Sequence, residues 1–291
     1  MQQILVPTDF SECAENAKDT AIHIAERNGA TIHLLHSVNT PVDWREFEAY
    51  TRRGTIPFSG GGQAELHSDF NTAVEAIESK MGEATQEAEA KSLEACSHVV
   101  YNYNYNDIVK WADEKEMDLI VMGSHGASGW NELFVGSITQ RVVRTSEVPV
   151  LVVKGDNELR ELHDLVFASD FEEPEASTDL KEAISFAKIF GAKLHMLFVN
   201  TPRKFEDSMH SYEKMDRCLS EVTVDIPYEQ HVFNEYSIED GVRSFAEREN
   251  MGSISIATHG YTGVKRLFDP NVTEHLINHS DRPVLCLTKG R

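Results

Sequence analysis

The chain carries one sequence pattern twice, in the same order. Four segments of the first half return in the second: 4–10 as 165–171, 30–41 as 192–202, 111–117 as 245–251 and 146–151 as 280–285. Repetition over this distance indicates a duplicated domain rather than a solenoid unit, and 291 residues are enough for two domains. The polar stretch 155–158 marks the boundary, which gives domains at 1–155 and 160–291.

Each half alternates apolar runs with helical patterns. In the first half the predicted strands are 3–7, 31–38, 97–103, 118–122 and 148–153, and the predicted helices include 13–28 and 106–116. The runs are largely continuous rather than alternating, as in strands covered on both faces. We therefore predict an α/β fold made of two tandem, doubly wound, five-stranded parallel-sheet domains of Rossmann-like type. Such sheets bind ligands beyond the carboxyl ends of their strands.

The halves differ most between their second and third strands, where the first half is longer. Within the insertion 42–96, the glycine-rich segment 52–62 is predicted to be a loop, and the Glu- and Ala-rich segment 69–95 a helix. The loop could close over a site or cover a partner. A disordered surface insertion is the alternative.

The charge of the chain limits its partners. With 48 acidic and 27 basic residues, the net charge is −21. Such a surface repels nucleic acid and anionic membranes, and a nucleotide site must supply its own local positive potential. The four cysteines form no CxxC pair, and Cys286 is expected to be a buried small hydrophobe. We find no signal peptide or membrane span in the sequence, and expect a cytoplasmic protein with reduced thiols.

A glycine motif follows the fourth predicted strand. Gly123 and Gly126 are followed, after nine residues, by Gly136 and Ser137 at the start of an amphipathic helix. Glycine lets the backbone approach a ligand closely, and the N–H groups that begin a helix bind anions. The hydroxyl of Ser137 or Thr139 can bond a phosphate oxygen or help to hold Mg²⁺. The spacing predicts a phosphate site, and glycines that only make tight turns are the alternative.

With Asp9 and the turn after the second strand, this motif resembles the ATP-binding branch of the universal stress protein family. The resemblance covers essentially the whole chain, twice, and implies a tandem member with the universal stress protein fold. In that family the first-strand aspartate lies by the nucleoside, a backbone group after the second strand contacts adenine, and the glycine loop holds ribose and phosphates. It implies ATP, ADP or AMP as ligand, with or without Mg²⁺, held by Pro7, Thr8, Asp9, Val38, Met122, Gly123, His125, Gly126, Gly136, Ser137, Ile138 and Thr139.

The second half has lost part of this motif. Ala257 replaces the first glycine and Pro270-Asn271 replace the Gly-Ser turn, while Asp170 remains. Alanine adds a methyl group where the backbone should approach phosphate, and proline removes an N–H donor. We expect this domain to be a degenerate copy that packs against the first, as two subunits do in dimers of the family.

The last strands of the two halves, 148–153 and 283–288, are expected to form that contact between the domains. A homodimer of the whole chain is a further arrangement that the resemblance allows.

Other motifs are absent or weak. The sequence has no P-loop, no GxGxxG after the first strand and no GxSxG. The glycines at 60–62 resemble the turn of ATP pyrophosphatases but lie far from the first strand. His33 and His36 should lie on opposite faces of a strand, so we predict no metal site, and His125 either donates to a phosphate or stabilises its loop.

These observations favour a nucleotide-dependent sensor or regulator in the stress response. No catalytic residue is predicted, because no general base or arginine finger is evident, and whether ATP is slowly hydrolysed stays open. The alternatives are a nucleotide-free scaffold of the same fold, a weak ATPase, and a nucleotidyl-transfer enzyme of the same sheet type.

Overall fold

The computed structural model describes residues 1–38, 63–102, 104–124, 136–154, 162–172, 175–257 and 270–288. The first half contains β1 (Gln3–Pro7), α1 (Glu12–Asn28), β2 (Thr31–Val38), α3 (Gln63–Ala90), β3 (Ala95–Tyr101), α4 (Tyr105–Glu114), β4 (Leu119–Gly123), α5 (Ser137–Thr145) and β5 (Val150–Val153). The second contains β6 (Asp164–Ala168), α6 (Glu175–Phe190), β7 (Lys193–Asn200), α7 (Ser208–Ser220), β8 (Tyr228–Asn234), α8 (Ile238–Arg248), β9 (Ser253–Ala257), α9 (Pro270–His279) and β10 (Val284–Leu287).

The two halves share one ten-stranded sheet in the order β3-β2-β1-β4-β5-β10-β9-β6-β7-β8. Strands are parallel within each half, and β5 and β10 are antiparallel, with Leu151 opposite Leu285. The predicted fold of two tandem doubly wound domains is confirmed. The predicted contact between the last strands is present as the β5–β10 pair.

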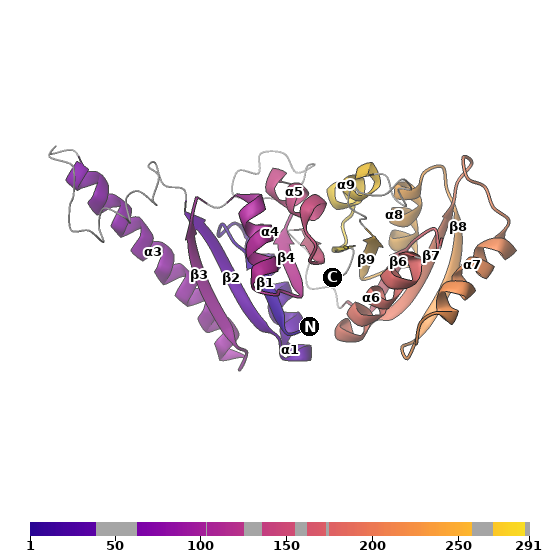
Figure 1. Ribbon diagram of the computed structural model, residues 1–291, viewed down its shortest axis with the longest axis horizontal. Helices are drawn as coiled ribbons and strands as arrows, with labels where there is room; N and C mark the ends of the chain where they lie inside the picture. Colours follow the sequence, from indigo (N-terminus) through magenta and orange to yellow (C-terminus); the bar gives the residue numbers. More distant parts are fainter. Residues whose placement is uncertain are drawn as a thin grey trace.

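Helices cover both faces of the sheet (Figure 1). One face packs against α1, α3, α6 and α7, in a core that includes Ala21, Met81, Leu180 and Met215. The other packs against α4, α5, α8 and α9. Since both faces are covered, the central strands are buried along their whole length. In β5 and β10 this gives continuous apolar runs, whereas β9 alternates isoleucine with the buried Ser253 and Ser255.

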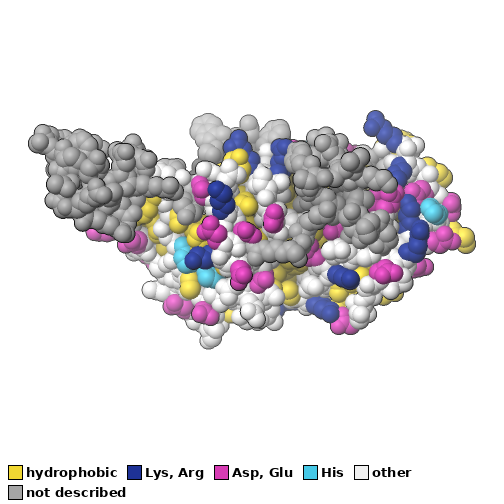
Figure 2. Space-filling model, in the orientation of Figure 1, with side chains coloured by type: hydrophobic (Ala, Val, Ile, Leu, Met, Phe, Trp, Pro, Cys, Tyr) yellow, Lys and Arg dark blue, Asp and Glu magenta, His cyan; other side chains and the backbone are white. Residues whose placement is uncertain are grey.

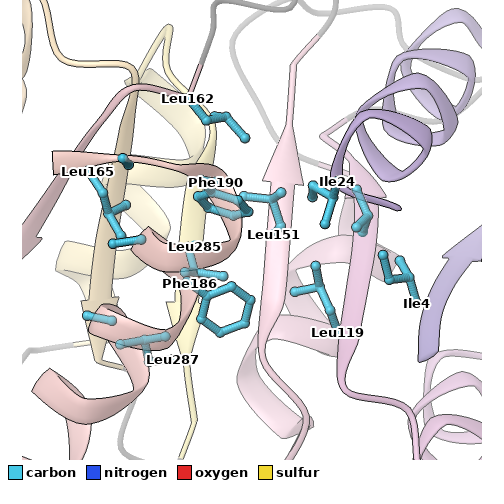
Figure 3. Packing of buried hydrophobic residues seen from close by; sticks show 14 of the residues in the cluster. Ile4, Ile24, Leu119, Leu151, Leu162, Leu165, Phe186, Phe190, Leu285 and Leu287 are labelled. Atoms are coloured by element: carbon cyan, nitrogen blue, oxygen red, sulfur yellow. The ribbon is translucent and has the colours of Figure 1, made fainter. Parts of the chain in front are cut away.

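The core continues across the boundary between the halves. Phe186 and Phe190 of α6 lie close to Leu151 of β5 and Leu285 of β10 (Figure 3), and all four are buried. Polar contacts frame this core: Arg27 donates to the carbonyl of Phe190, Lys154 Nζ to the carbonyl of Asn278 at 2.5 Å, and Thr288 Oγ1 to the carbonyl of Glu147 at 2.6 Å. The second half therefore covers a strand edge that the first would otherwise expose.

Element boundaries differ from the sequence-based ones mainly around α3 and β3. The helix predicted at 69–95 ends at Ala90, and the strand predicted at 97–103 begins at Ala95. Ser92 takes the left-handed conformation at φ 63°, and the N–H of Leu93 returns to the carbonyl of Ala88 at 3.1 Å. This is a helix end of the kind that glycine usually makes, so a serine at this position does not signal it.

Several predictions concern residues outside the described ranges. These are the glycine-rich segment 52–62 and the domain boundary at 155–158. Among the described helices, none has the length and apolar character needed to cross a bilayer. The four cysteines are free thiols, and burial raises the pKa of Cys286 to about 12, as suits the buried small hydrophobe expected there.

We expect Glu182 to make the stability of the protein depend on pH. Burial on α6, and secondarily the nearby Asp179, raise its pKa to about 7, against 4.5 for an ordinary glutamate. Between these values the unfolded chain releases a proton that the folded chain retains, so stability falls as pH rises. Glu182→Gln should remove up to roughly 3 kcal/mol of this fall between pH 5 and pH 8.

Urea unfolding at both pH values checks this prediction. Glu213→Gln, which changes a side chain that is 63% exposed on α7, is the control and should follow the wild type. An equal pH dependence in wild type and Glu182→Gln would contradict the burial of this carboxyl group.

Candidate functional site

Those predicted nucleotide residues that the structure describes gather at one edge of the first half. The chain runs outward from β1 to β2 and β3, then returns to the other side of β1 with β4. Ligands bind at the carboxyl edge of such a switch point. Pro7 ends β1 there, Thr8 and Asp9 follow it, and Met122 and Gly123 end β4.

A fixed turn positions the end of β1. The N–H of Thr8 donates to the carbonyl of Leu35 at 2.9 Å, and the Thr8 hydroxyl accepts from the N–H of Phe10 at 3.1 Å. Asp9 Oδ1 accepts from the N–H of Ser11 at 3.0 Å. Phe10 has φ 60°, which is rare for a bulky residue and persists only where its surroundings impose it. Asp9 remains exposed at the edge of the sheet.

The second half repeats this turn. Ser169 Oγ accepts from Phe171, whose φ is 53°, and Asp170 Oδ1 accepts from Glu172. The turn therefore belongs to the architecture of both domains and cannot by itself mark the half that binds a ligand.

Gly123 has a structural reason to be glycine. A Cβ atom there would lie 2.5 Å from the carbonyl oxygen and 2.8 Å from the Cβ of Cys13, in the first turn of α1. Glycine thus lets α1 approach the end of β4. The sequence argument assigned this small residue to phosphate contact, and Ala257 to the loss of that contact. Because the approach of α1 accounts for glycine at 123 without a ligand, neither this glycine nor Ala257 is by itself evidence about phosphate contact.

The start of α5 is the open part of the site. The N–H of Gly136 donates to the carbonyl of Ser124 at 2.6 Å, which ties the helix to the end of β4. Gly136 is the N-cap and provides no side-chain hydrogen bond, while Ser137 and Ile138 are exposed. Helix N–H groups that lack a side-chain acceptor are suited to an anion.

Two predicted site residues are already engaged in the fold. Thr139 is buried and donates its hydroxyl proton to the carbonyl of Gly123 at 2.9 Å, so it has no proton to offer a phosphate. The carbonyl of Val38 accepts from the N–H of Asn102 at 2.9 Å as β2 pairs with β3. His125 and Gly126 lie outside the described residues.

The corresponding edge of the second half carries an ion-pair network. Lys204 Nζ lies 3.5 Å from Asp170 and 2.7 Å from Glu172, because a short turn after β7 brings the lysine back over the sheet edge. Burial raises the pKa of Asp170, and the lysine partly offsets this. The helix at this edge, α9, begins at Pro270, which has no N–H. The corresponding edges of the two halves therefore differ in charge and in the hydrogen-bond donors that they offer.

A pair of histidines in each half was missed by the sequence analysis. His33 Nδ1 lies 3.0 Å from His98 Nε2, and His195 Nδ1 lies 3.0 Å from His231 Nε2. Each pair joins neighbouring parallel strands and contacts an aromatic ring of the covering helix, Trp111 or Phe245. Burial lowers the pKa of His33, His98 and His231. Repetition of both histidines in the aligned halves was the available signal.

The fold defines a tandem α/β protein whose two halves present different described residues at the carboxyl ends of their strands. A family model described as the universal stress protein family matches residues 1–154 and again 162–288. The chain belongs to the universal stress protein family.

Known relatives match either one domain or the whole chain. The universal stress protein MJ0577 of Methanocaldococcus jannaschii is 29% identical over 157 residues, which is 54% of this chain and 96% of that protein. The universal stress protein YxiE of Bacillus subtilis is 29% identical over 152 residues, covering 52% and 98%. A solved universal stress protein from Archaeoglobus fulgidus matches 99% of this chain and 98% of its own, with 22% identity and a TM-score of 0.72. This last likeness supports the tandem fold.

Proposed function

We propose that the first half binds an adenine nucleotide, ATP or its products ADP and AMP, with or without Mg²⁺. The protein would then act in the stress response as a nucleotide-dependent sensor or regulator, with the second half as its built-in partner domain. The observation that carries this proposal is the start of α5, where the N-cap Gly136 offers the helix N–H groups no side-chain acceptor of its own beside the switch point of the sheet.

The charge of the molecule makes this local arrangement necessary. On the face shown in Figure 2, acidic side chains are spread over both halves and interspersed with basic ones. A polyphosphate therefore meets a repulsive average field and depends on donors placed at the site itself. The N–H groups of α5 and the exposed Ser137 hydroxyl are such donors. Asp9 lies at the same edge and would face the nucleoside, away from the phosphates.

The differences between the halves support a single site. In the second half the place of the open helix start is taken by Pro270, and Lys204 pairs with Asp170 where a nucleoside would lie. The β5–β10 contact explains why such a domain is useful without a ligand, since it completes the sheet and core of the first.

Calorimetric titration with Mg-ATP tests this proposal. We expect one equivalent to bind per chain, with GTP as the control for the adenine base and ADP and AMP to rank the phosphates. Two equivalents would contradict the single site. No binding of any of the adenine nucleotides would favour a scaffold of the same fold.

A further inference from the structure

We propose that the second half also holds a divalent transition-metal ion of the zinc type, bound by His195, Glu229 and His231. The described residues contain one group of this kind, in which three ligand atoms from histidine, cysteine or carboxylate side chains all lie within 4.8 Å of one another. The proposal is independent of nucleotide binding.

The spacing of the three donors fits one ion. His195 Nδ1 lies 3.0 Å from His231 Nε2, and Glu229 Oε2 lies 3.8 Å and 3.6 Å from these nitrogens. A tetrahedral zinc ion with bonds of about 2.0–2.2 Å separates its donors by about 3.4 Å. The observed triangle brackets this value, so small side-chain rotations are enough to close it. Two histidines and a glutamate, with a fourth position for water, form a known zinc ligand set.

Neighbouring groups hold two of the three donors, His195 and Glu229, in the form that a metal requires. His195 Nε2 donates to Asp164 Oδ1 at 2.9 Å, so the neutral ring carries its lone pair on Nδ1, which faces the other ligands. A carboxylate behind a histidine is the usual outer partner of a metal ligand. Lys193 pairs with Glu229 Oε1 and leaves Oε2 directed to the histidines.

Solvent can reach the cluster from the edge of the sheet. His195 is buried, with 7% of its side chain exposed, but His231 is 26% and Glu229 51% exposed. The cluster lies near the start of β7 and β8, whereas Asn200 ends β7 at the ligand edge. Five residues of strand, about 16 Å, therefore separate it from the region that corresponds to the nucleotide site.

The first half provides an internal control. It keeps the paired His33 and His98, but Cys96 stands opposite His33 where Glu229 stands opposite His195. Gln3 is the partner of His33 Nε2, as Asp164 is the partner of His195 Nε2. Cysteine is also a zinc ligand by type, but among the described residues only His195, Glu229 and His231 bring three ligand atoms within 4.8 Å of one another. The described part of the first half therefore has a histidine pair without a third ligand atom in reach, and should bind the ion far more weakly.

Titration of the tag-free full chain with Zn²⁺, and with Co²⁺ for its visible absorption, tests the site. Excess Mg²⁺ is added to saturate weak carboxylate sites on this acidic protein. We expect one equivalent of Zn²⁺, an absorption band typical of four-coordinate Co²⁺, and a higher unfolding temperature with Zn²⁺. Glu229→Gln and His231→Gln should each weaken binding by about 100-fold or more, and His98→Gln should leave it unchanged.

Because Glu229 is half exposed, its glutamine variant is expected to fold, which thermal unfolding without metal verifies. Wild type that binds no equivalent under these conditions would overturn the proposal. So would retention of full affinity in both second-half variants, or loss of the bound equivalent in His98→Gln.

Discussion

Gly123→Val is expected to destabilise the first domain severely, whether or not a nucleotide is present. The Cβ of any larger residue would lie 2.5 Å from the carbonyl oxygen and 2.6 Å from the carbonyl carbon of Cys13. Both atoms belong to the backbone of α1, so no side-chain rotation can make room. Overpacking in a close-packed core costs about 1–3 kcal/mol, and more when the backbone must move. We expect about 3 kcal/mol for valine and somewhat less for alanine, measured by urea unfolding.

The second half supplies the matched comparison. Ala257 ends β9 as Gly123 ends β4, and it is buried. Ala257→Gly should cost only about 1 kcal/mol, from the lost methyl group and the greater freedom of the unfolded chain. If Gly123→Val unfolds at the same urea concentration as the wild type, the close contact with Cys13 is wrong. Because a larger residue at 123 is expected to destabilise the first domain, loss of nucleotide binding in such a variant is not evidence about phosphate contact.

The architecture could be predicted from the sequence because the order of strands and helices follows from the pattern of apolar residues. Strands β1 and β2 begin and end as predicted, since the apolar residues of each are bounded by polar turns. The pairing of β5 with β10 followed from the repeat and the family resemblance. The end of α3 did not, because Ser92 makes a turn that sequence preferences assign to glycine or asparagine.

The candidate site was harder to predict, because spacing along the chain does not say what a residue faces. Glycine at 123 is consistent with a phosphate or with a neighbouring helix, and the contact with Cys13 is visible only after α1 is placed. The histidine pairs depend on the parallel register between strands. His33 lies opposite Cys96, and His98, two residues further along β3, points to the same face of the sheet. Lys204 reaches Asp170 through a turn that carries no motif.

Gly136→Asp is expected to abolish nucleotide binding while the protein remains folded. Gly136 has φ −56° and ψ 142°, backbone angles open to any residue at a helix N-cap. Aspartate there can accept hydrogen bonds from the first N–H groups of α5, and relative to glycine it changes helix stability by only a few tenths of a kcal/mol. Its carboxylate would occupy the place proposed for phosphate.

The matched variant Gly136→Asn separates charge from volume. Asparagine caps the helix in the same way and has nearly the same size, but no charge. Two like charges about 4 Å apart repel by about 4 kcal/mol at the effective dielectric constant near a protein surface. Affinity for Mg-ATP should therefore fall at least about 100-fold more for aspartate than for asparagine, with equal unfolding midpoints for the two proteins. If both variants bind Mg-ATP as tightly as the wild type, the phosphates lie elsewhere. If Gly136→Asp alone loses affinity, the phosphates lie at the start of α5.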